Sequence, residues 1–132
     1  MKHEFGLTVR STDVDMIGHV NHAQYLVYME WARFEWLRDA GLTLEELTQR
    51  NLLPVVVRVE IDYKKELMMD EKVKVVSEAL RLGNKSAVIG QRVMDEEGNT
   101  ACEAEVTVVM IDAVSRRATS LPEEFREAFA TE

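Results

Sequence analysis

The segment from residue 13 to residue 22 brings together side chains that could carry chemistry. It holds two carboxylates, two imidazoles and one carboxamide, namely Asp13, Asp15, His19, His22 and Asn21. A helical pattern begins directly after it, and the start of a helix offers unpaired N–H groups and a positive dipole end that stabilise an oxyanion. A carboxylate placed there can attack an activated carbonyl or deprotonate a water molecule. This segment is therefore the candidate catalytic site.

The same segment allows other interpretations. Asp13 and Asp15 could simply cap turns, since Asp side chains accept hydrogen bonds from nearby backbone N–H groups, and the histidines would then be surface residues. A calcium loop begins in a similar way, but Ile17 and Gln24 stand where a polar ligand and a bidentate Glu are required. Zinc binding by the two histidines and Asp15 is a weaker alternative, because i,i+3 spacing at a loop–helix junction is a weak signal.

Other catalytic patterns are absent from the sequence. It contains no G-x-S-x-G, H-E-x-x-H, G-x-G-x-x-G or P-loop motif. The one cysteine, Cys102, excludes an internal disulfide and a cysteine-only metal cluster. It lies on the apolar face of a predicted strand, where we expect an inert core thiol.

One long helix is predicted over residues 22–40, with Asn21 as its N-cap and Gly41 as its stop. Its apolar face is broad and rich in aromatic residues, so it must be well buried. Thr43 and Glu46 form a capping box for a short second helix that ends near Asn51.

Alternating apolar and polar residues predict strands near 5–9, 55–64, 71–82, 85–95 and 102–110. In the strand after Pro54, one face is expected to carry Val55, Val57, Val59, Ile61 and Tyr63. A last short helix is predicted over residues 122–130. The expected fold is α+β, a curved antiparallel sheet wrapped around the long helix. A second copy is expected to cover the apolar sheet edge, which predicts a homo-oligomer.

Length and composition indicate one soluble domain over residues 1–132. The chain is 46% hydrophobic and 30% charged, and 24 acidic residues against 16 basic ones give a net charge of −8. Without a basic stripe, nucleic acid is not an expected partner. No apolar run is long enough to cross a membrane, and the first residues lack the apolar centre of a signal peptide. We therefore expect a cytoplasmic protein.

Residues 9–25, VRSTDVDMIGHVNHAQY, resemble the signature of hotdog-fold acyl-CoA thioesterases of the 4-hydroxybenzoyl-CoA thioesterase class, particularly its bacterial YbgC-like branch. The family pattern is approximately D-x-D-x-x-G-H-V-N-x-x-x-Y followed by an aromatic-rich helix, and each of these positions matches. The resemblance continues through residues 54–63, 83–86 and 103–105. It implies a single hotdog domain that hydrolyses an acyl-CoA to the free acid and coenzyme A, with no metal and no cofactor.

The resemblance also implies catalytic roles, position by position. Asp15 matches the catalytic carboxylate, which acts as nucleophile or as general base for water. The backbone N–H near His22 matches the group that polarises the thioester carbonyl. Asn21 and His19 match polar positions that line the site. Many relatives carry a second Asn in place of His22, which affects side-chain contacts rather than the backbone role.

Substrate contacts follow from the same resemblance. Tyr25 matches the aromatic residue just inside the helix. Lys85 and Ser86 match a strand start that meets the phosphates of coenzyme A in relatives. One or two of the helix aromatics are expected to line an acyl pocket, and the others to be structural; the set is Tyr25, Tyr28, Trp31, Phe34 and Trp36.

Two other functions remain open at this point: a non-catalytic hotdog protein that binds acyl-CoA, and a thioesterase specific for acyl carrier protein. A hotdog dehydratase is disfavoured because its longer, Pro-containing pattern is absent. The resemblance implies a homodimer or homotetramer with the active site at a subunit interface, and it leaves the acyl group undefined.

Overall fold

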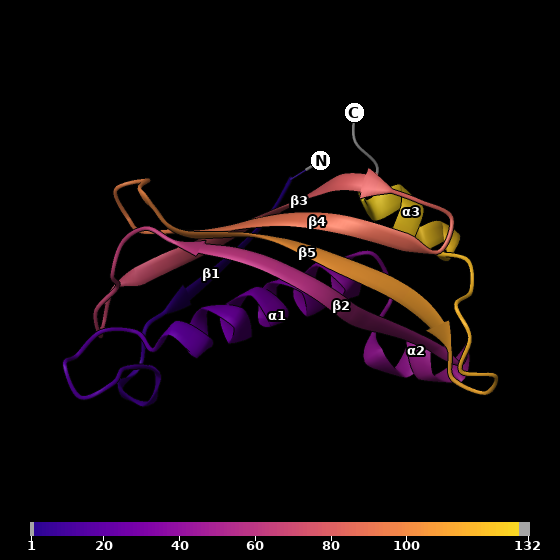
Figure 1. Ribbon diagram of the computed structural model, residues 1–132, viewed down its shortest axis with the longest axis horizontal. Coiled ribbons are helices and arrows are strands. Elements are labelled where there is room, and N and C mark those ends of the chain that lie inside the picture. Colours follow the sequence, from indigo (N-terminus) through magenta and orange to yellow (C-terminus); the bar gives the residue numbers. More distant parts are fainter. Residues whose placement is uncertain (1, 130–132) are drawn as a thin grey trace.

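The computed structural model describes residues 2–129. A five-stranded antiparallel sheet has the order β1-β3-β4-β5-β2 and consists of β1 (Lys2–Thr8), β2 (Leu52–Tyr63), β3 (Lys72–Leu82), β4 (Ser86–Met94) and β5 (Thr100–Asp112). The sheet curves over one long helix, α1 (His22–Asp39), as Figure 1 shows. The predicted α+β architecture is confirmed.

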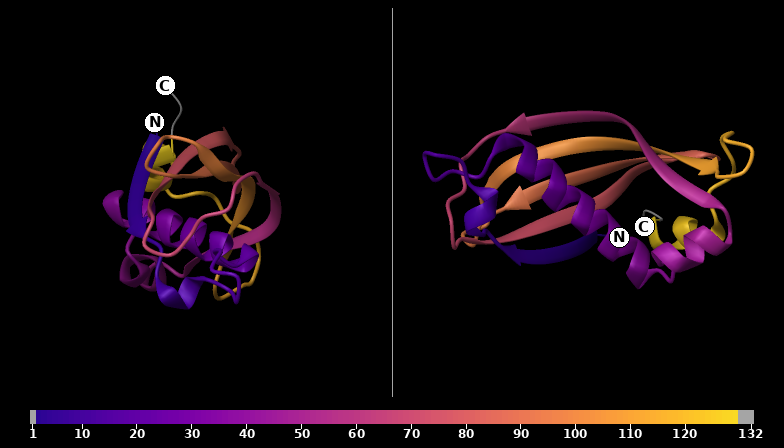
Figure 2. Two further views of the ribbon diagram at one scale, coloured as in Figure 1. Left: turned by 90° about the vertical axis from the view of Figure 1, so that its left-hand side faces the viewer. Right: turned by 90° about the horizontal axis from the view of Figure 1, so that it is seen from below.

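Helix α1 begins and ends where the sequence predicts. The Asn21 side chain accepts a hydrogen bond from the backbone N–H of Ala23 at 2.9 Å, and the left-handed Gly41, with φ of 88°, follows the helix end. Seen from below, α1 crosses the concave face of the sheet diagonally (Figure 2). It packs against β1, β3 and β4.

Three short helical segments complete the chain: η1 (Ser11–Asp13), α2 (Leu44–Gln49) and α3 (Glu123–Phe129). The Thr43 hydroxyl caps α2 by accepting a hydrogen bond from the Glu46 N–H at 3.1 Å. Of the predicted last helix, Ala130 lies outside the described residues. The segment 11–21, expected to be a loop throughout, opens with the single turn η1.

The core lies between α1 and the inner face of β3, β4 and β5. Tyr25, Tyr28 and Trp36 are buried in it, whereas Trp31 and Phe34 are exposed. A polar group joins helix and sheet here: the Gln91 amide donates to the Met29 carbonyl at 2.9 Å and to the Ser77 hydroxyl at 3.0 Å. Arg33 in turn donates to the Gln91 Oε1 at 2.9 Å, and burial lowers the pKa of its guanidinium.

Strand β2 departs from the predicted alternation. Residues 59–63 pair with β5 and keep the predicted alternation, since Val59, Ile61 and Tyr63 lie opposite buried residues of that strand. The register then shifts at Val57, where a bulge inserts one extra residue, and Val55 pairs with the outward-facing Val109. The prediction that Val55 shares a face with the later residues is therefore wrong. Because side chains alternate between the two faces of a strand, one inserted residue moves the side chains before it to the opposite face of the sheet.

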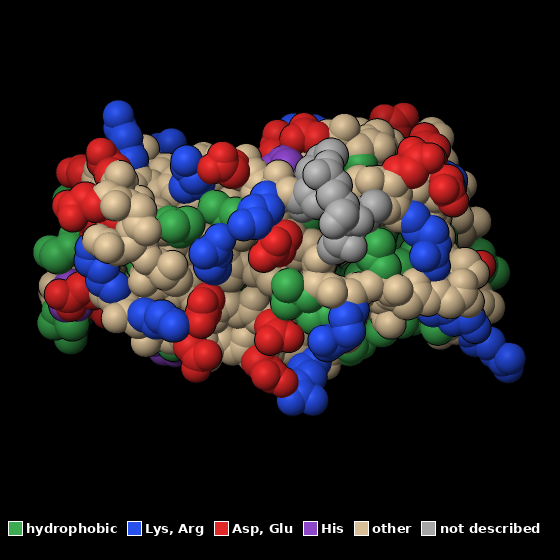
Figure 3. All heavy atoms as spheres, turned by 90° about the horizontal axis from the view of Figure 1, so that it is seen from above, with side chains coloured by type: hydrophobic (Ala, Val, Ile, Leu, Met, Phe, Trp, Pro, Cys, Tyr) green, Lys and Arg blue, Asp and Glu red, His purple; other side chains and the backbone are tan. Residues whose placement is uncertain are grey.

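β2 is an edge strand, and it leaves apolar side chains uncovered. The exposed apolar residues of β2 and of the neighbouring side of α1 are Leu26, Trp31, Phe34, Leu53, Val55, Val56, Val57, Val59 and Tyr63. On the face seen in Figure 3, by contrast, acidic and basic side chains are interspersed. No helix within residues 2–129 is long and apolar enough to span a membrane.

Candidate active site

A tight loop holds Asp15 immediately before α1. Val14 and Val20 form an antiparallel bridge, and the Asp15 N–H donates to the His19 carbonyl at 2.9 Å. The chain reverses at Gly18, whose φ of 83° suits glycine and whose N–H donates to the Asp15 carbonyl at 3.0 Å. The two ends of the loop therefore lie together, and its far end continues directly into the helix.

The Asp15 carboxylate is exposed to solvent in this protomer. Its Oδ1 accepts a hydrogen bond from the Ile17 N–H at 3.0 Å, an Asx turn. Asp15 can therefore cap this turn and still be accessible to a substrate, so the two interpretations given from the sequence do not exclude each other. The turn fixes the orientation of the carboxylate and leaves it accessible.

The start of α1 presents one unpaired backbone donor. The Asn21 side chain satisfies the Ala23 N–H, and the Asn21 carbonyl accepts from the Gln24 N–H at 2.8 Å. Within residues 2–129 the structure gives the His22 N–H no acceptor. A free N–H at the positive end of a helix is the kind of group that can polarise a carbonyl oxygen.

The two histidines have different surroundings. The Nδ1 of the half-buried His19 lies 3.1 Å from a carboxylate oxygen of Glu66. His22 is exposed, and its ring packs edge-on against Tyr63 with the ring centres 6.4 Å apart. In the described part of the chain, no three His, Cys, Asp or Glu side chains converge as a metal site requires.

Two tyrosines tie the helix start to the end of β2. The Tyr63 hydroxyl donates to the His22 carbonyl at 2.9 Å, and the Tyr25 hydroxyl donates to the Lys65 carbonyl at 3.3 Å. Burial raises the pKa of Tyr25 to about 12 and also raises that of Tyr63, so both remain protonated donors at neutral pH. Tyr63 was expected only as a strand residue, because the sequence gives no sign that its hydroxyl reaches the helix.

Asp13, the other carboxylate of the motif, is buried and does not reach solvent as Asp15 does. Its Oδ2 accepts hydrogen bonds from the Tyr28 hydroxyl at 2.8 Å and from the Arg10 N–H at 2.9 Å. Burial, followed by this hydrogen bond, raises the pKa of the Tyr28 hydroxyl. Neither residue of this pair was expected to contact the other.

Lys85 and Ser86 are not brought to Asp15 within one protomer. Ser86 pairs with Val109 of β5, which pairs with Val55 of β2, whereas the helix start is tied to Tyr63. Val109 and Cys102, the β5 partners of Val55 and Tyr63, are seven residues apart, about 24 Å along an extended strand. Figure 1 shows the same separation, with the 13–21 loop at one end of the molecule and the turn between β3 and β4 at the other.

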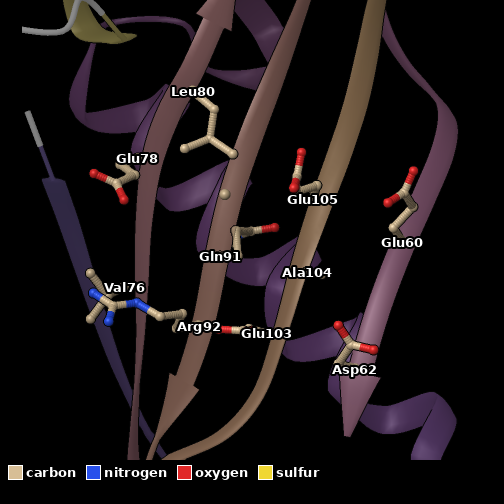
Figure 4. A pocket seen from close by; sticks show the side chains of 11 residues that line it. Glu60, Asp62, Val76, Glu78, Leu80, Gln91, Arg92, Glu103, Ala104 and Glu105 are labelled. Atoms are coloured by element: carbon tan, nitrogen blue, oxygen red, sulfur yellow. The ribbon is translucent and has the colours of Figure 1, made fainter.

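Two hollows differ in chemical character. A cavity of about 350 Å³ lies between α1, β2 and α3, and its walls are mainly apolar, including Phe34, Val56 and Phe125. Another of about 260 Å³ lies on the outer face of the sheet (Figure 4), and its lining includes Arg92 and the carboxylates of Glu60, Asp62, Glu78, Glu103 and Glu105. An acidic surface repels phosphate, so the apolar cavity is the better candidate for a substrate.

Cys102 is buried in β5, and burial raises the pKa of its thiol to about 12. A thiol that is neutral and inaccessible is not a nucleophile. The expectation of an inert core cysteine is confirmed.

Comparisons with known proteins identify the family of this chain. A family model described as the thioesterase-like superfamily matches residues 9–129. The long-chain acyl-CoA thioesterase FadM of Escherichia coli (strain K12) is 30% identical over 122 residues, covering 92% of this chain and 92% of FadM. The acyl-CoA thioester hydrolase YbgC of Escherichia coli O6:H1 is 30% identical over 110 residues, or 83% of this chain and 82% of YbgC.

A solved structure gives the likeness in fold. The protein SAV2348 from Staphylococcus aureus, in complex with CoA, superposes with a TM-score of 0.92 at 22% identity, over 98% of this chain and 82% of that one. The chain therefore belongs to the thioesterase-like superfamily and has the hotdog fold that its 9–25 motif predicts.

Proposed function

We propose that the protein hydrolyses the thioester bond of an acyl-CoA, with Asp15 as the catalytic carboxylate and the His22 N–H as the oxyanion donor. One observation carries this proposal: the 13–21 loop orients an accessible carboxylate directly before a helix whose first N–H is unpaired. FadM and YbgC, about 30% identical over most of the chain, are named as acyl-CoA hydrolases.

Thioesters suit so small a site. The carbonyl carbon is electrophilic and the thiolate is a good leaving group, so one carboxylate and one oxyanion donor suffice. An Asp15 oxygen adds to the carbonyl carbon, the C–S bond breaks, and water then hydrolyses the resulting anhydride. In the other route Asp15 takes a proton from water as the water adds to the carbonyl carbon, the C–S bond then breaks, and the thiolate takes up that proton. Both routes yield the free acid and coenzyme A.

The substrate contacts become contiguous in a homodimer. Lys85 and Ser86 lie at the level of Val55, and Asp15 lies near the level of Tyr63. If the free edges of two β2 strands pair antiparallel about Val59, then Val55 of one protomer lies opposite the partner's Tyr63. Each site then draws its carboxylate from one protomer and its phosphate contacts from the other. The exposed apolar residues of β2 and α1 favour such a contact.

The same dimer brings the apolar cavity to the site. Val55 and Val56 line this cavity, so in that register it opens beside the partner's helix start. Its walls favour an aliphatic acyl chain, and Phe34 is the one aromatic of α1 that lines it. Tyr25, Tyr28 and Trp36 lie instead in the core.

Release of coenzyme A tests the proposal. A thiol-reactive dye follows release from acyl-CoAs of increasing chain length, for the wild-type protein and for Asp15→Asn. Asp62→Asn, an exposed carboxylate on β2, is the matched control. We expect Asp15→Asn to lose roughly 10²- to 10⁴-fold in kcat and the control to retain it.

Binding measurements separate the remaining possibilities. Titration calorimetry with a non-hydrolysable thioether analogue of acyl-CoA should give similar affinities for the wild-type protein and Asp15→Asn. A wild-type protein that binds acyl-CoA and releases no thiol would contradict the proposal. Such a result would indicate a binding protein or an enzyme that acts on acyl carrier protein.

A further inference from the structure

We propose that Asp13 and Tyr28 are a positioning pair, which fixes the Asp15 loop against the body of α1. The catalytic consequence rests on the proposed function, but the geometric role does not. Neither residue touches the place where a substrate would react. Both act through the backbone of the loop.

Asp13 connects three parts of the site. Its carboxylate accepts the Arg10 N–H before the loop and the Tyr28 hydroxyl from the second turn of α1. Its backbone carbonyl accepts the Asn21 N–H at 3.0 Å, at the point where the loop enters the helix. One buried residue therefore holds the start of the loop, its end and the helix together.

Tyr28 is the helix side of this connection. It is fully buried, and its hydroxyl donates to the Asp13 side chain. A buried hydroxyl is costly to leave without an acceptor, so the folded state keeps this hydrogen bond. Packing of the ring and the hydroxyl bond together fix the distance from the helix to the loop.

Asp15 is two residues from Asp13, and the His22 N–H follows Asn21. A shift of Asp13 would therefore move the Asp15 carboxylate relative to the His22 N–H, the proposed oxyanion donor. A displacement of about 1 Å in a site of this kind can lower turnover by about 100-fold. The exposed loop, which packs few side chains of its own, depends on this buried anchor.

Tyr28→Phe removes only the hydroxyl and is the principal variant. Asp13→Asn keeps an acceptor oxygen and should preserve the loop. The matched control is Ser77→Ala, which removes another fully buried hydroxyl that bonds Gln91 in the core. Each variant is compared with the wild-type protein by amide hydrogen exchange, by thermal unfolding and by kcat and KM on an acyl-CoA.

In Tyr28→Phe we expect the amides of Asp15, Gly18 and Asn21 to exchange roughly 10-fold faster. The hydrogen bond from Tyr28 to Asp13 is then missing, so local opening of the loop costs less free energy. We expect kcat to fall roughly 10- to 100-fold with KM unchanged. Ser77→Ala should lower the unfolding temperature and leave loop exchange and kcat as in the wild-type protein. Asp13→Asn should retain most of the turnover.

If the loop amides exchanged at the same rate in Tyr28→Phe as in Ser77→Ala, the positioning role would be wrong. The contact between Asp13 and Tyr28 would then be ordinary core packing. Faster loop exchange with unchanged kcat would overturn the catalytic consequence. If the wild-type protein itself released no thiol, the proposed function would fail, and exchange alone would decide whether the pair positions the loop.

Discussion

At the scale of single residues, the proposed mechanism assigns a role to the backbone N–H of His22 and none to its ring. The N–H is the first of α1, and the capping Asn21 serves the next donor in the chain rather than this one. The ring is exposed and contacts only the edge of Tyr63. Any side chain other than proline at this position leaves the donor in place.

His22→Pro tests this donor directly. Proline is well tolerated at the first position of a helix, and Asn21 already has the extended backbone, φ of −61° and ψ of 139°, that a following proline requires. The substitution therefore removes the N–H together with the imidazole and leaves the course of the backbone unchanged. We expect kcat to fall by about 10²- to 10³-fold, measured by thiol release.

His22→Ala is the control, because it removes the imidazole and keeps the N–H. It should retain most of the turnover. If the alanine variant lost as much activity as the proline variant, the imidazole rather than the backbone would carry the role.

At the scale of elements, the loop depends on the left-handed conformation of Gly18. Gly98, in the turn between β4 and β5, has nearly the same φ, 84° against 83°. A methyl group added at either position would meet no atom within 4 Å. The two glycines are therefore a matched pair that differs only in location.

Gly18→Ala and Gly98→Ala should each destabilise the protein by about 1 kcal/mol, since alanine strains the left-handed region. Chemical denaturation measures this loss. Only Gly18→Ala should also lower kcat, because the 13–21 loop, which holds Asp15, would move to relieve the strain. Equal kcat values in the two variants would show that the loop conformation is not critical for turnover.

The end of β2 is held to the β4–β5 turn by an ion pair between Lys65 and Asp95. The hydrogen bond from Lys65, aided by that from the Asn99 N–H, lowers the pKa of Asp95 to about 2. A carboxyl whose pKa is lowered by folding stabilises the folded state above its unfolded pKa, and this contribution disappears as pH falls through the folded value. The window is therefore about pH 4 to pH 2.

Unfolding free energies of the wild-type protein and Asp95→Asn should differ by a constant amount above about pH 5. The difference should shrink as the pH approaches 2. A difference that persists unchanged into acid would mean that the Asp95 charge contributes nothing.

Much of this arrangement could be predicted from the sequence. The alternation and the caps at Asn21 and Thr43 define the elements because they are local signals. The bulge at Val57 was missed because valine at every position from 55 to 57 gives no alternation to reveal an inserted residue. The contacts of Tyr28 with Asp13 and of Tyr63 with His22 were also missed, since they join distant segments through side-chain reach alone.

At the scale of the whole molecule, β2 is an edge strand of the sheet with no neighbouring strand on its outer side. Strand β2 offers free backbone groups on one side and exposed valines on its faces. An edge of this length and character is suited to pairing with another chain. In the proposed dimer, the separation of Lys85 from Asp15 within one protomer would give the pairing a functional reason in addition to burial.

Val59→Cys tests the proposed register. At the centre of an antiparallel pair, a residue faces its own copy with Cα atoms about 4.5 to 5.5 Å apart, within reach of a disulfide. Mild oxidation should therefore yield a covalent dimer on a non-reducing gel. Val55→Cys, with an exposure of 40% against 37% for Val59, should not, because it would face the partner's Tyr63.

The buried thiol of Cys102 makes such experiments clean. Dyes, cross-linkers and spin labels react with accessible thiolates. Cys102, the one cysteine of the chain, is buried, and its raised pKa keeps the thiol neutral. In a thiol-release assay the folded protein contributes no background of its own. A cysteine introduced at the fully exposed Met16, at the tip of the catalytic loop, would be labelled alone. The distance between two such labels would then report the spacing of the two 13–21 loops across the proposed dimer in solution.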